Sequence, residues 1–485
     1  MSADSPLSAG MVLDGFRLDE PLHQGGMANL WAVTRVEPKQ GEDFPLIMKV
    51  PRIKGGEDPA TIVGYEVEQM LMPMLNGPHA PRYVARGDWK RQAYIVMERV
   101  PGVSLRPRLD EAPLPPEEVA DIGARVADAL QALHRQNVIH LDVKPSNIMI
   151  RPDGLAVLVD FGLSRHAHLP DLLEEEFELP MGTSPYMSPE QVQFVRNDPR
   201  SDIFALGVML YHLATGERPF GQPTSVRGLR KRLYEEPVPP RAINPAIPTW
   251  LQEIILHCLE VKASRRYQSA AQLALDLRNP DTLTLTERAE RIHANSGLWT
   301  RFKRWFVALG ADPAAAVTSG TITGAGGARI PVQQVGAGSA IIIAAVDTDN
   351  AEPELLTQLR ATVQRLASTE PGARVACVSV MKTARIGMDE LTDKQGRSHH
   401  VKKLVALKDW GYPLASALEL GDARLTYHVL EAPDPAGAIV EFAAKSGADH
   451  IIMGARGNST LRRYLGSVSS AVLAESPCTV TVVRA

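Results

Sequence analysis

The stretch His140–Asn147 reads HLDVKPSN, and the triplet Asp160-Phe161-Gly162 follows at the end of the apolar run LAVLVD. The first string places an aspartate, a lysine and an asparagine on one short loop, and the second places an aspartate at the end of a strand. Carboxylate, amide and ammonium groups at these offsets suit one task, which is to hold metal-bound phosphates while a hydroxyl group lies beside a carboxylate. A lone Asp or Asn in a loop is usually a turn former, whereas the joint pattern is specific.

Bulk composition narrows the classes of protein to consider. The 485 residues predict two to three domains. A net charge of −4 argues against nucleic acid as a partner. The isolated cysteines Cys258, Cys377 and Cys478 favour buried thiols in a reducing compartment over a disulfide framework or a zinc site. The N-terminus does not read as a secretory signal, and no apolar run approaches the ~20 residues of a transmembrane helix, so we expect a cytoplasmic protein.

The pattern along the chain divides it into three parts. Residues 11–280 alternate strands and helices and are expected to form one unit. Residues 281–338 begin as a charged helical stretch and become a flexible linker rich in Gly, Ala, Ser and Thr. Residues 339–485 begin and end with apolar strands, Ala340–Val346 and Thr479–Val483. Between these strands, helical periodicity and the helix start Asp434-Pro435 predict a mostly parallel sheet.

The loop and triplet described first resemble the catalytic loop and metal-binding segment of bacterial serine/threonine protein kinases. The resemblance spans about 270 residues and implies a bilobal α+β fold that uses ATP and Mg²⁺. It implies that Asp142 is the base or orienting group for the substrate hydroxyl and that Lys144 neutralises the γ-phosphate. It further implies that Asn147 and Asp160 hold magnesium, and that proteins with Ser or Thr are the substrates.

The resemblance assigns further groups near the amino terminus of the unit. LHQGGMANLWAV stands where a phosphate-covering loop is expected. His23 replaces its first glycine and Ala28 its third, but Gly25 and Gly26 remain. Lys49, in FPLIMKV, is expected to hold the α- and β-phosphates and to pair with a helix glutamate. Glu68 is the preferred partner and Glu66 the alternative. Pro73 is expected to end or kink that helix.

The segment AYIVMERVPG resembles the hinge between the lobes. It implies that Met97 lines the adenine pocket and that backbone groups from Glu98 to Val100 contact adenine. Later in the chain, GTSPYMSPE resembles the end of an activation segment, where Thr183 is expected to contact Asp142 and Lys144. Three further residues are expected to be structural: a Glu190–Arg266 ion pair, and Asp202 as a tether of the catalytic loop.

Two features depart from the usual kinase pattern. Leu141 stands where an arginine normally receives an activation-loop phosphate, and residues 165–182 contain no Ser, Thr or Tyr. We therefore predict a kinase that does not need phosphorylation in this segment. The acidic run Glu174–Glu176 leaves three interpretations open: a fixed negative charge in place of phosphate, a site that recruits basic substrates, or a solvated mobile loop.

Residues 339–485 resemble a universal stress protein domain, which implies an α/β flavodoxin-like fold with a mostly parallel five-stranded sheet. The glycine pattern Gly454, Gly457, Gly466 and Ser467 is similar to the family's nucleotide loop, although its longer spacer is one residue short. Asp347 is expected near the adenine or ribose of a second nucleotide. The alternative is a glycine turn in a dimerisation module, with the last strand at the two-fold axis.

Residues 298–309 carry an apolar stripe at helical spacing with basic residues beside it. Docking on a neighbouring domain and peripheral membrane contact are the two interpretations. The whole chain is thus expected to be a serine/threonine protein kinase regulated by a stress-type domain that senses, binds nucleotide or dimerises. The alternative is a pseudokinase, which binds nucleotide and signals as a scaffold without catalysis.

Overall fold

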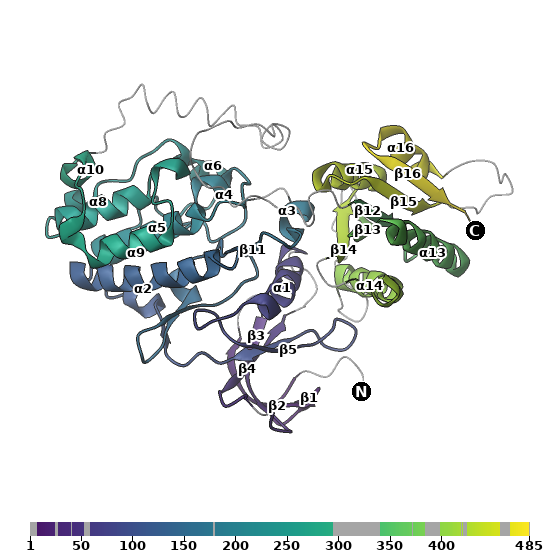
Figure 1. Cartoon of the computed structure of the whole chain (residues 1–485), viewed down its shortest axis with the longest axis horizontal. Coiled ribbons are helices and arrows are strands. Elements are labelled where there is room, and N and C mark those ends of the chain that lie inside the picture. Colours follow the sequence, from purple (N-terminus) through teal and green to yellow (C-terminus); the bar gives the residue numbers. More distant parts are fainter. Residues whose placement is uncertain are drawn as a thin grey trace.

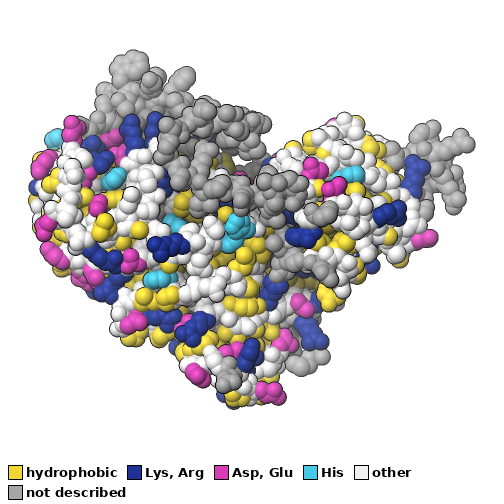
Figure 2. Space-filling model, in the orientation of Figure 1, with side chains coloured by type: hydrophobic (Ala, Val, Ile, Leu, Met, Phe, Trp, Pro, Cys, Tyr) yellow, Lys and Arg dark blue, Asp and Glu magenta, His cyan; other side chains and the backbone are white. Residues whose placement is uncertain are grey.

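A computed structural model describes residues 7–24, 28–39, 41–52, 59–177, 180–293, 340–370, 372–383, 398–418, 420, 424–455 and 466–484. Figure 1 shows a small strand-rich lobe, a larger helical lobe, and a parallel-sheet domain that lies beside both. Acidic and basic side chains are interspersed over the described part of the face in Figure 2, in keeping with the small net charge. No helix among the described residues is long and apolar enough to cross a membrane.

The small lobe is an antiparallel sheet packed against one helix, α1 (Pro59–Leu71). Its described strands run in the order β1-β2-β3-β4-β6-β5. The helix passes into a 3-10 turn at Met72–Met74, as predicted from Pro73, which cannot donate a helix hydrogen bond. The strands are β1 (Val12–Leu13), β2 (Phe16–Gln24), β3 (Ala28–Arg35), β4 (Leu46–Pro51), β5 (Tyr83–Arg86) and β6 (Ile95–Glu98).

The larger lobe is mainly helical and is built around α2 and α5. The apolar stripe predicted from Val119, Val126 and Leu133 faces the interior, because these side chains are fully buried. Pro116 opens α2 at its first position, where its missing N–H costs nothing. The helices are α2 (Pro116–His134), α3 (Leu172–Glu176), α4 (Pro189–Val192), α5 (Arg200–Thr215), α6 (Val226–Arg230), α7 (Pro240–Ile243), α8 (Thr249–Cys258), α9 (Ala270–Arg278) and α10 (Glu287–Glu290).

Short antiparallel strands of the larger lobe hold the loop that opened the sequence analysis. This loop leaves β8, forms a 3-10 turn at Pro145–Asn147, and enters β9, which pairs with β10 just before Asp160. The loop is therefore fixed at both ends by pairing. The strands are β7 (Val103–Ser104), β8 (Val138–Ile139), β9 (Ile148–Ile150), β10 (Ala156–Leu158) and β11 (Arg165–His166).

The C-terminal domain confirms the prediction of a parallel five-stranded sheet. Its described strands run in the order β14-β13-β12-β15-β16, and every adjacent pair is parallel. The order reverses between β12 and β15, the place where doubly wound sheets bind ligands. The strands are β12 (Ile341–Ala345), β13 (Arg374–Lys382), β14 (Leu425–Ala432), β15 (His450–Gly454) and β16 (Thr479–Val483), and the helices are α13 (Pro353–Thr369), α14 (His399–Leu418), α15 (Pro435–Ser446) and α16 (Ser467–Glu475).

The helix starts of this domain follow from the sequence. Asp434 caps α15, as predicted, because its carboxylate accepts the N–H of Ala436 at 3.1 Å. Leu355, Leu359 and Val363 of α13 are buried at helical spacing. Side chains of the kinase-like lobes and of this domain belong to one continuous hydrophobic cluster, which includes Leu172 and Leu407.

Candidate active site

Lys49, on β4, lies between two carboxylates contributed by distant parts of the chain. Its ammonium group donates to Glu68 of α1 at 2.5 Å and to Asp160 at 2.8 Å. Burial opposes the charge on Lys49, but Asp160 and Glu68 outweigh it and raise the pKa of the ammonium group. Lys49 in turn lowers the pKa of Asp160 to about 2. The site therefore holds a protonated lysine beside an ionised Asp160.

The choice between the two helix glutamates is settled by the contacts. Glu68 is 1% exposed and reaches Lys49, whereas Glu66 accepts from the indole N–H of Trp89 at 3.1 Å and from Lys408 of the C-terminal domain. Residues two apart on a helix point in nearly opposite directions, about 200° apart. Glu66 therefore faces the other domain while Glu68 faces the cleft.

Asp142 is the centre of a second cluster. Its Oδ1 accepts the N–H of Thr183 at 3.0 Å and the hydroxyl of Thr183 at 2.7 Å. Its Oδ2 accepts from Lys144 at 2.6 Å and from the amide of Asn147 at 3.0 Å. Lys144 also donates to the Thr183 hydroxyl at 2.9 Å, so the predicted contacts of Thr183 are present. A carboxylate, an ammonium group and a hydroxyl are thus held together beside the activation segment.

Oxygen ligands for a divalent cation are available at the edge of this cluster. The NH₂ group of Asn147 donates hydrogen bonds to Asp142, so the amide oxygen of Asn147 points away from Asp142. Lys49 bonds Oδ1 of Asp160, and the Asp160 side chain is 46% exposed. Carboxylate and amide oxygens suit Mg²⁺, which usually takes one or two protein ligands and completes its shell with phosphate oxygens and water. The donor set therefore fits the predicted metal.

Two residues of the site have strained backbone geometry. Leu141 has φ 61° and Asp160 has φ 69°, in the left-handed region that side chains rarely adopt. Asp202, fully buried on α5, accepts the N–H of His140 at 2.9 Å and of Leu141 at 2.8 Å. Gln191 donates to the carbonyl of Leu141 at 2.8 Å. The predicted tether is confirmed, and it supplies the contacts that hold the loop in this conformation.

The hinge segment lies where adenine recognition was predicted, on β6. Met97 is 8% exposed, and the Glu98 carboxylate is tied to Arg151 at 2.7 Å. The N–H of Glu98 donates to the carbonyl of Arg82, and the N–H of Arg99 donates to the carbonyl of Pro45. Adenine recognition by this segment would therefore rely on its carbonyl groups and on Val100.

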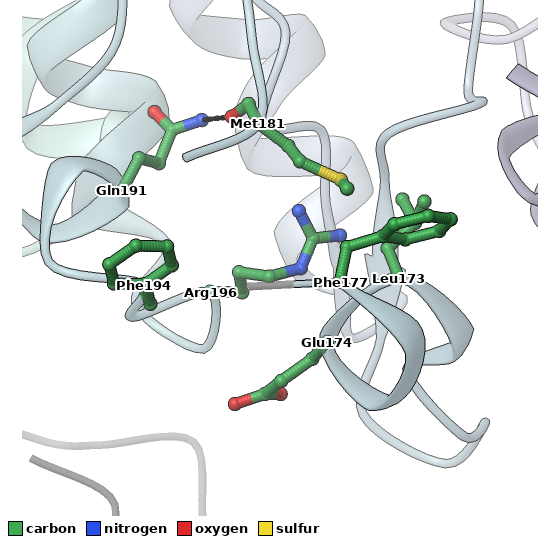
Figure 3. Close-up of a pocket in the computed structure, with 7 residues that line it drawn as sticks. All are labelled: Leu173, Glu174, Phe177, Met181, Gln191, Phe194 and Arg196. Atoms are coloured by element: carbon green, nitrogen blue, oxygen red, sulfur yellow. Dashed lines mark hydrogen bonds between the residues drawn. The ribbon is translucent and has the colours of Figure 1, made fainter. Parts of the chain in front are cut away.

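The activation segment contains an anchor that the sequence analysis missed. Asp171, 5% exposed, accepts from Arg196 at 2.8 Å and lies 3.8 Å from Arg165. Burial favours the neutral acid, but Arg196 and Arg165 reverse this effect and lower the pKa of Asp171. Figure 3 shows the guanidinium group of Arg196 directed toward Phe177 and Met181. Asp171 also caps α3, so one carboxylate orders the segment at two points.

Two of the three glutamates in the acidic run on α3 are held by the C-terminal domain. The two terminal nitrogens of Arg374 donate hydrogen bonds to the Glu175 carboxylate at 2.6 and 2.7 Å, and Glu176 contacts Nδ1 of His428 at 2.9 Å. The side chains of Glu175 and Glu176 are 12% and 3% exposed. The solvated-loop interpretation is therefore wrong for Glu175 and Glu176, whose carboxylates are not accessible for recruiting basic substrates, whereas the Glu174 side chain is 49% exposed.

The segment after Thr183 is anchored on the larger lobe. Arg266 forms the predicted pair with Glu190 through two bonds of 2.6 and 2.7 Å. Ser188 and Gln191 cap α4 reciprocally. Arg232, fully buried, donates to the carbonyls of Met187 and Ser184. These bonds fix the backbone on which a peptide substrate would lie.

The nucleotide residues expected in the C-terminal domain are only partly described. Asp347 lies two residues after β12, and Gly454 is the last residue of the adjacent strand β15, so both lie at the switch point. Gly466 and Ser467 begin α16. The Asp347 carboxylate accepts the N–H groups of Asp349 and Asn350, which is a turn-stabilising role. A Cβ atom on Gly454 would lie 2.9 Å from the end of the Leu355 side chain, which would have to shift to accommodate it.

Several expectations fall outside the described residues. They concern Gly25, Gly26, Gly457 and residues 298–309. Among the described residues, the kinase-like lobes and the C-terminal domain meet through α1, α3, α14 and the β14–α15 region, as Figure 1 shows.

Comparisons with known proteins agree with this geometry. Residues 53–276 match the protein kinase domain family, and residues 340–484 match the universal stress protein family. The chain therefore combines a protein kinase domain with a universal stress protein domain. The strands β1–β4 precede the matched kinase segment but share one sheet with β5 and β6, so the fold of this domain begins earlier than the match.

The kinase part is similar to named bacterial enzymes. It is 32% identical over 269 residues to the serine/threonine-protein kinase PknB of Mycobacterium leprae, covering 54% of this chain and 42% of that protein. It is 30% identical over 298 residues to PknB of Mycobacterium tuberculosis, covering 59% and 47%. A probable serine/threonine-protein kinase of Clostridium perfringens is 32% identical over 231 residues, covering 47% and 33%. The matched region spans less than half the length of each of these relatives.

Proposed function

We propose that this chain is a serine/threonine protein kinase that transfers the γ-phosphate of ATP to protein hydroxyl groups. The observation that carries the proposal is the joint arrangement of Lys49 between Glu68 and Asp160, and of Asp142 between Lys144 and Thr183. These contacts bring together groups from five separated segments of the chain. The names of the similar proteins support the same activity.

Each residue has a task that follows from its charge and position. Lys49 binds the α- and β-phosphates and is itself oriented by Glu68. Asp142 orients the substrate hydroxyl and accepts its proton, and Lys144 stabilises the negative charge that develops on the transferred group. Asn147 and Asp160 would hold Mg²⁺, which neutralises phosphate charge when bound. Catalysis then consists largely of positioning and electrostatic stabilisation.

The pseudokinase alternative gains no support from the comparisons or from the contacts. Leu141, which favours this alternative together with the altered glycine loop, has its side chain buried at 3% exposure, and its backbone is held by Asp202 and Gln191. The substitution therefore removes a phosphate receptor without removing a group that would contact Mg²⁺ or the substrate hydroxyl.

We further propose that phosphorylation of residues 165–182 is not the control. Asp171 already supplies the fixed negative charge that orders this segment through Arg165 and Arg196. A leucine at position 141 is consistent with this arrangement. An arginine at that position would bind an activation-loop phosphate, and no such phosphate is needed when Arg165 and Arg196 already hold a carboxylate. The acidic anchor is thus Asp171, which precedes the Glu174–Glu176 run.

The finer expectations for the C-terminal domain remain proposals. A second adenine nucleotide would bind between the ends of β12 and β15, and isothermal titration of ATP into Gly466→Val protein would test it. Dimerisation through β16 would be tested by light scattering of the whole chain. Cell fractionation would test the cytoplasmic location.

Transfer of radiolabel from γ-labelled ATP to a protein substrate tests the principal proposal. Wild-type protein is expected to label the substrate, and labelling is expected to stop with EDTA or with Asp142→Asn or Asp160→Ala. Asp121→Asn is the matched control, because Asp121 forms an exposed pair with Arg125 on α2. Equal labelling by wild type and both site variants would refute catalysis at this site.

A further inference from the structure

The universal stress protein domain contacts the kinase domain at the two elements that assemble the active site. Its Arg374, on β13, reaches Glu175 of α3, and its His428, on β14, reaches Glu176. Its Lys408, on α14, reaches Glu66 of α1. Figure 1 shows α3 and α1 facing β14, α14 and α15. The contacts therefore fall on the activation segment and on the helix that presents Glu68.

These contacts are buried, in contrast to ordinary surface pairs. The side chains of Arg374 and Glu175 are 8% and 12% exposed, and that of His428 is fully buried. Arg374 is further oriented by Thr426, whose hydroxyl lies 3.0 Å from it. Removing one partner of a buried charged pair leaves an uncompensated charge and is strongly destabilising. The Glu175–Arg374 bond is thus coupled to domain docking.

The chemistry of the neighbouring contact is different. Burial raises the pKa of Glu176 well above its ordinary value and lowers the pKa of His428 well below its own. Both changes favour the neutral forms of the two side chains, which lie 2.9 Å apart. Glu175–Arg374 supplies the charge, and Glu176–His428 fixes the direction in which α3 approaches β14.

The docked arrangement coincides with an assembled site. In the same structure Lys49 reaches both Glu68 and Asp160, and Asp142 reaches Thr183. Glu66 and Glu68 belong to one helix, so a bond from Lys408 to Glu66 restrains the helix that places Glu68. Asp171 begins the short helix that ends at Glu176, so the Arg374 bond restrains the segment just after its internal anchor. The groups that hold Asp142 belong to the kinase domain itself.

We propose that Arg374, His428 and Lys408 are positioning residues for phosphoryl transfer, and that the docked stress protein domain holds the kinase in its active arrangement. The inference rests on the proposed kinase activity. It assigns a direction to the regulation: docking activates. It also gives the acidic run on α3 a function, which is to receive the C-terminal domain.

The test uses the full-length chain with Glu175→Gln and Arg374→Glu as single variants. Each is expected to lower kcat for a protein substrate by about 5- to 150-fold, the usual range of coupling between sites, with the Kd for ATP unchanged. The combined Glu175→Arg, Arg374→Glu variant restores opposite charges and is expected to regain a large part of the activity. Hydrogen exchange at residues 172–177 should rise in the single variants and fall again in the combined one.

The matched control is Asp409→Asn, which removes the pair between Lys90 and Asp409. That pair also joins the domains, but both side chains are about half exposed, so a loss of activity below about fivefold is expected. If wild type is active and the single variants are as active or more active, the inference is overturned and the proposed function stays intact. Wild type that labels substrate no better than Asp142→Asn would overturn both.

Discussion

The carboxylate of Asp202 accepts the backbone N–H of Leu141 at 2.8 Å, and Leu141 has a left-handed φ of 61°. The acceptor lies on α5 and the donor lies 61 residues earlier, so a strained turn of the catalytic loop is anchored on the core of the larger lobe. The other Asp202 oxygen accepts from the N–H of His140 and contacts Nε2 of His134. One fully buried carboxylate therefore fixes the backbone immediately before Asp142.

Replacing Asp202 with asparagine should destabilise the kinase domain and slow catalysis. An amide has one acceptor oxygen and no charge, so part of this network is lost, at about 1.5–3 kcal/mol of unfolding free energy. Urea unfolding followed by tryptophan fluorescence, together with kcat, would measure both effects. Asp121→Asn, at an exposed pair, should change the unfolding free energy by less than about 0.5 kcal/mol. Equal stability of Asp202→Asn and wild type would contradict the anchoring role.

Replacing Lys49 with methionine should reduce kcat by about 100-fold or more, because it removes a preorganised positive charge from the phosphate site. It also leaves the buried Glu68 without its partner. Glu68→Gln should have a smaller effect, since Lys49 keeps Asp160. Steady-state kinetics would measure the order of the two effects, and Lys39→Met on an exposed loop is the control. A larger loss for Glu68→Gln than for Lys49→Met would count against the assigned roles.

The contribution of Asp171 should depend on pH in a defined direction. Its pKa is lowered in the folded protein, so the unfolded state binds more protons as the pH falls. The stabilisation is complete above the unfolded pKa of about 3.9 and disappears as the pH falls through the folded pKa. The difference in unfolding free energy between wild type and Asp171→Asn should thus be constant near neutrality and shrink below about pH 4. Urea unfolding at several pH values would measure this difference. A difference that grows on acidification would contradict the role of Asp171 as an anchor.

Gly454→Ala should destabilise the C-terminal domain whether or not a nucleotide binds there. The new Cβ would lie 2.9 Å from the Leu355 side chain, and overpacking of this kind typically costs about 1–3 kcal/mol. Leu355→Ala should relieve the clash, so the double variant should lose less stability than the sum of the single changes. Thermal unfolding of the four proteins would test this cycle. Additive losses would show that Gly454 is not constrained by the helix.

The sequence was sufficient where a function fixes residue type and local spacing. Asp142, Lys144 and Asn147 share one short loop, and the geometry of a phosphate site allows few other arrangements. Pro73 and Asp434 were equally readable, because a proline lacks an N–H and an aspartate caps a helix through bonds within its own segment.

The sequence was insufficient where a role depends on a distant partner. Glu175 and Glu176 are buried because they contact Arg374 and His428. These partners lie 199 and 252 residues further along the chain, and no residue near the acidic run indicates the contacts. The role of Asp171 likewise depends on Arg196, which lies 25 residues further along the chain. Glu66 and Glu68 could be ranked by position, but the exact phase of α1 decided their directions.

The ion pairs of Asp171 with Arg165 and Arg196 affect how such an enzyme can be inactivated. A phosphate ester can be hydrolysed by a phosphatase, but a carboxylate that is part of the polypeptide cannot be erased. Under the proposed function, removing a phosphate from this segment cannot inactivate the protein, whereas separating the two domains or degrading the protein would. The duration of its signal would be set by domain association and protein lifetime.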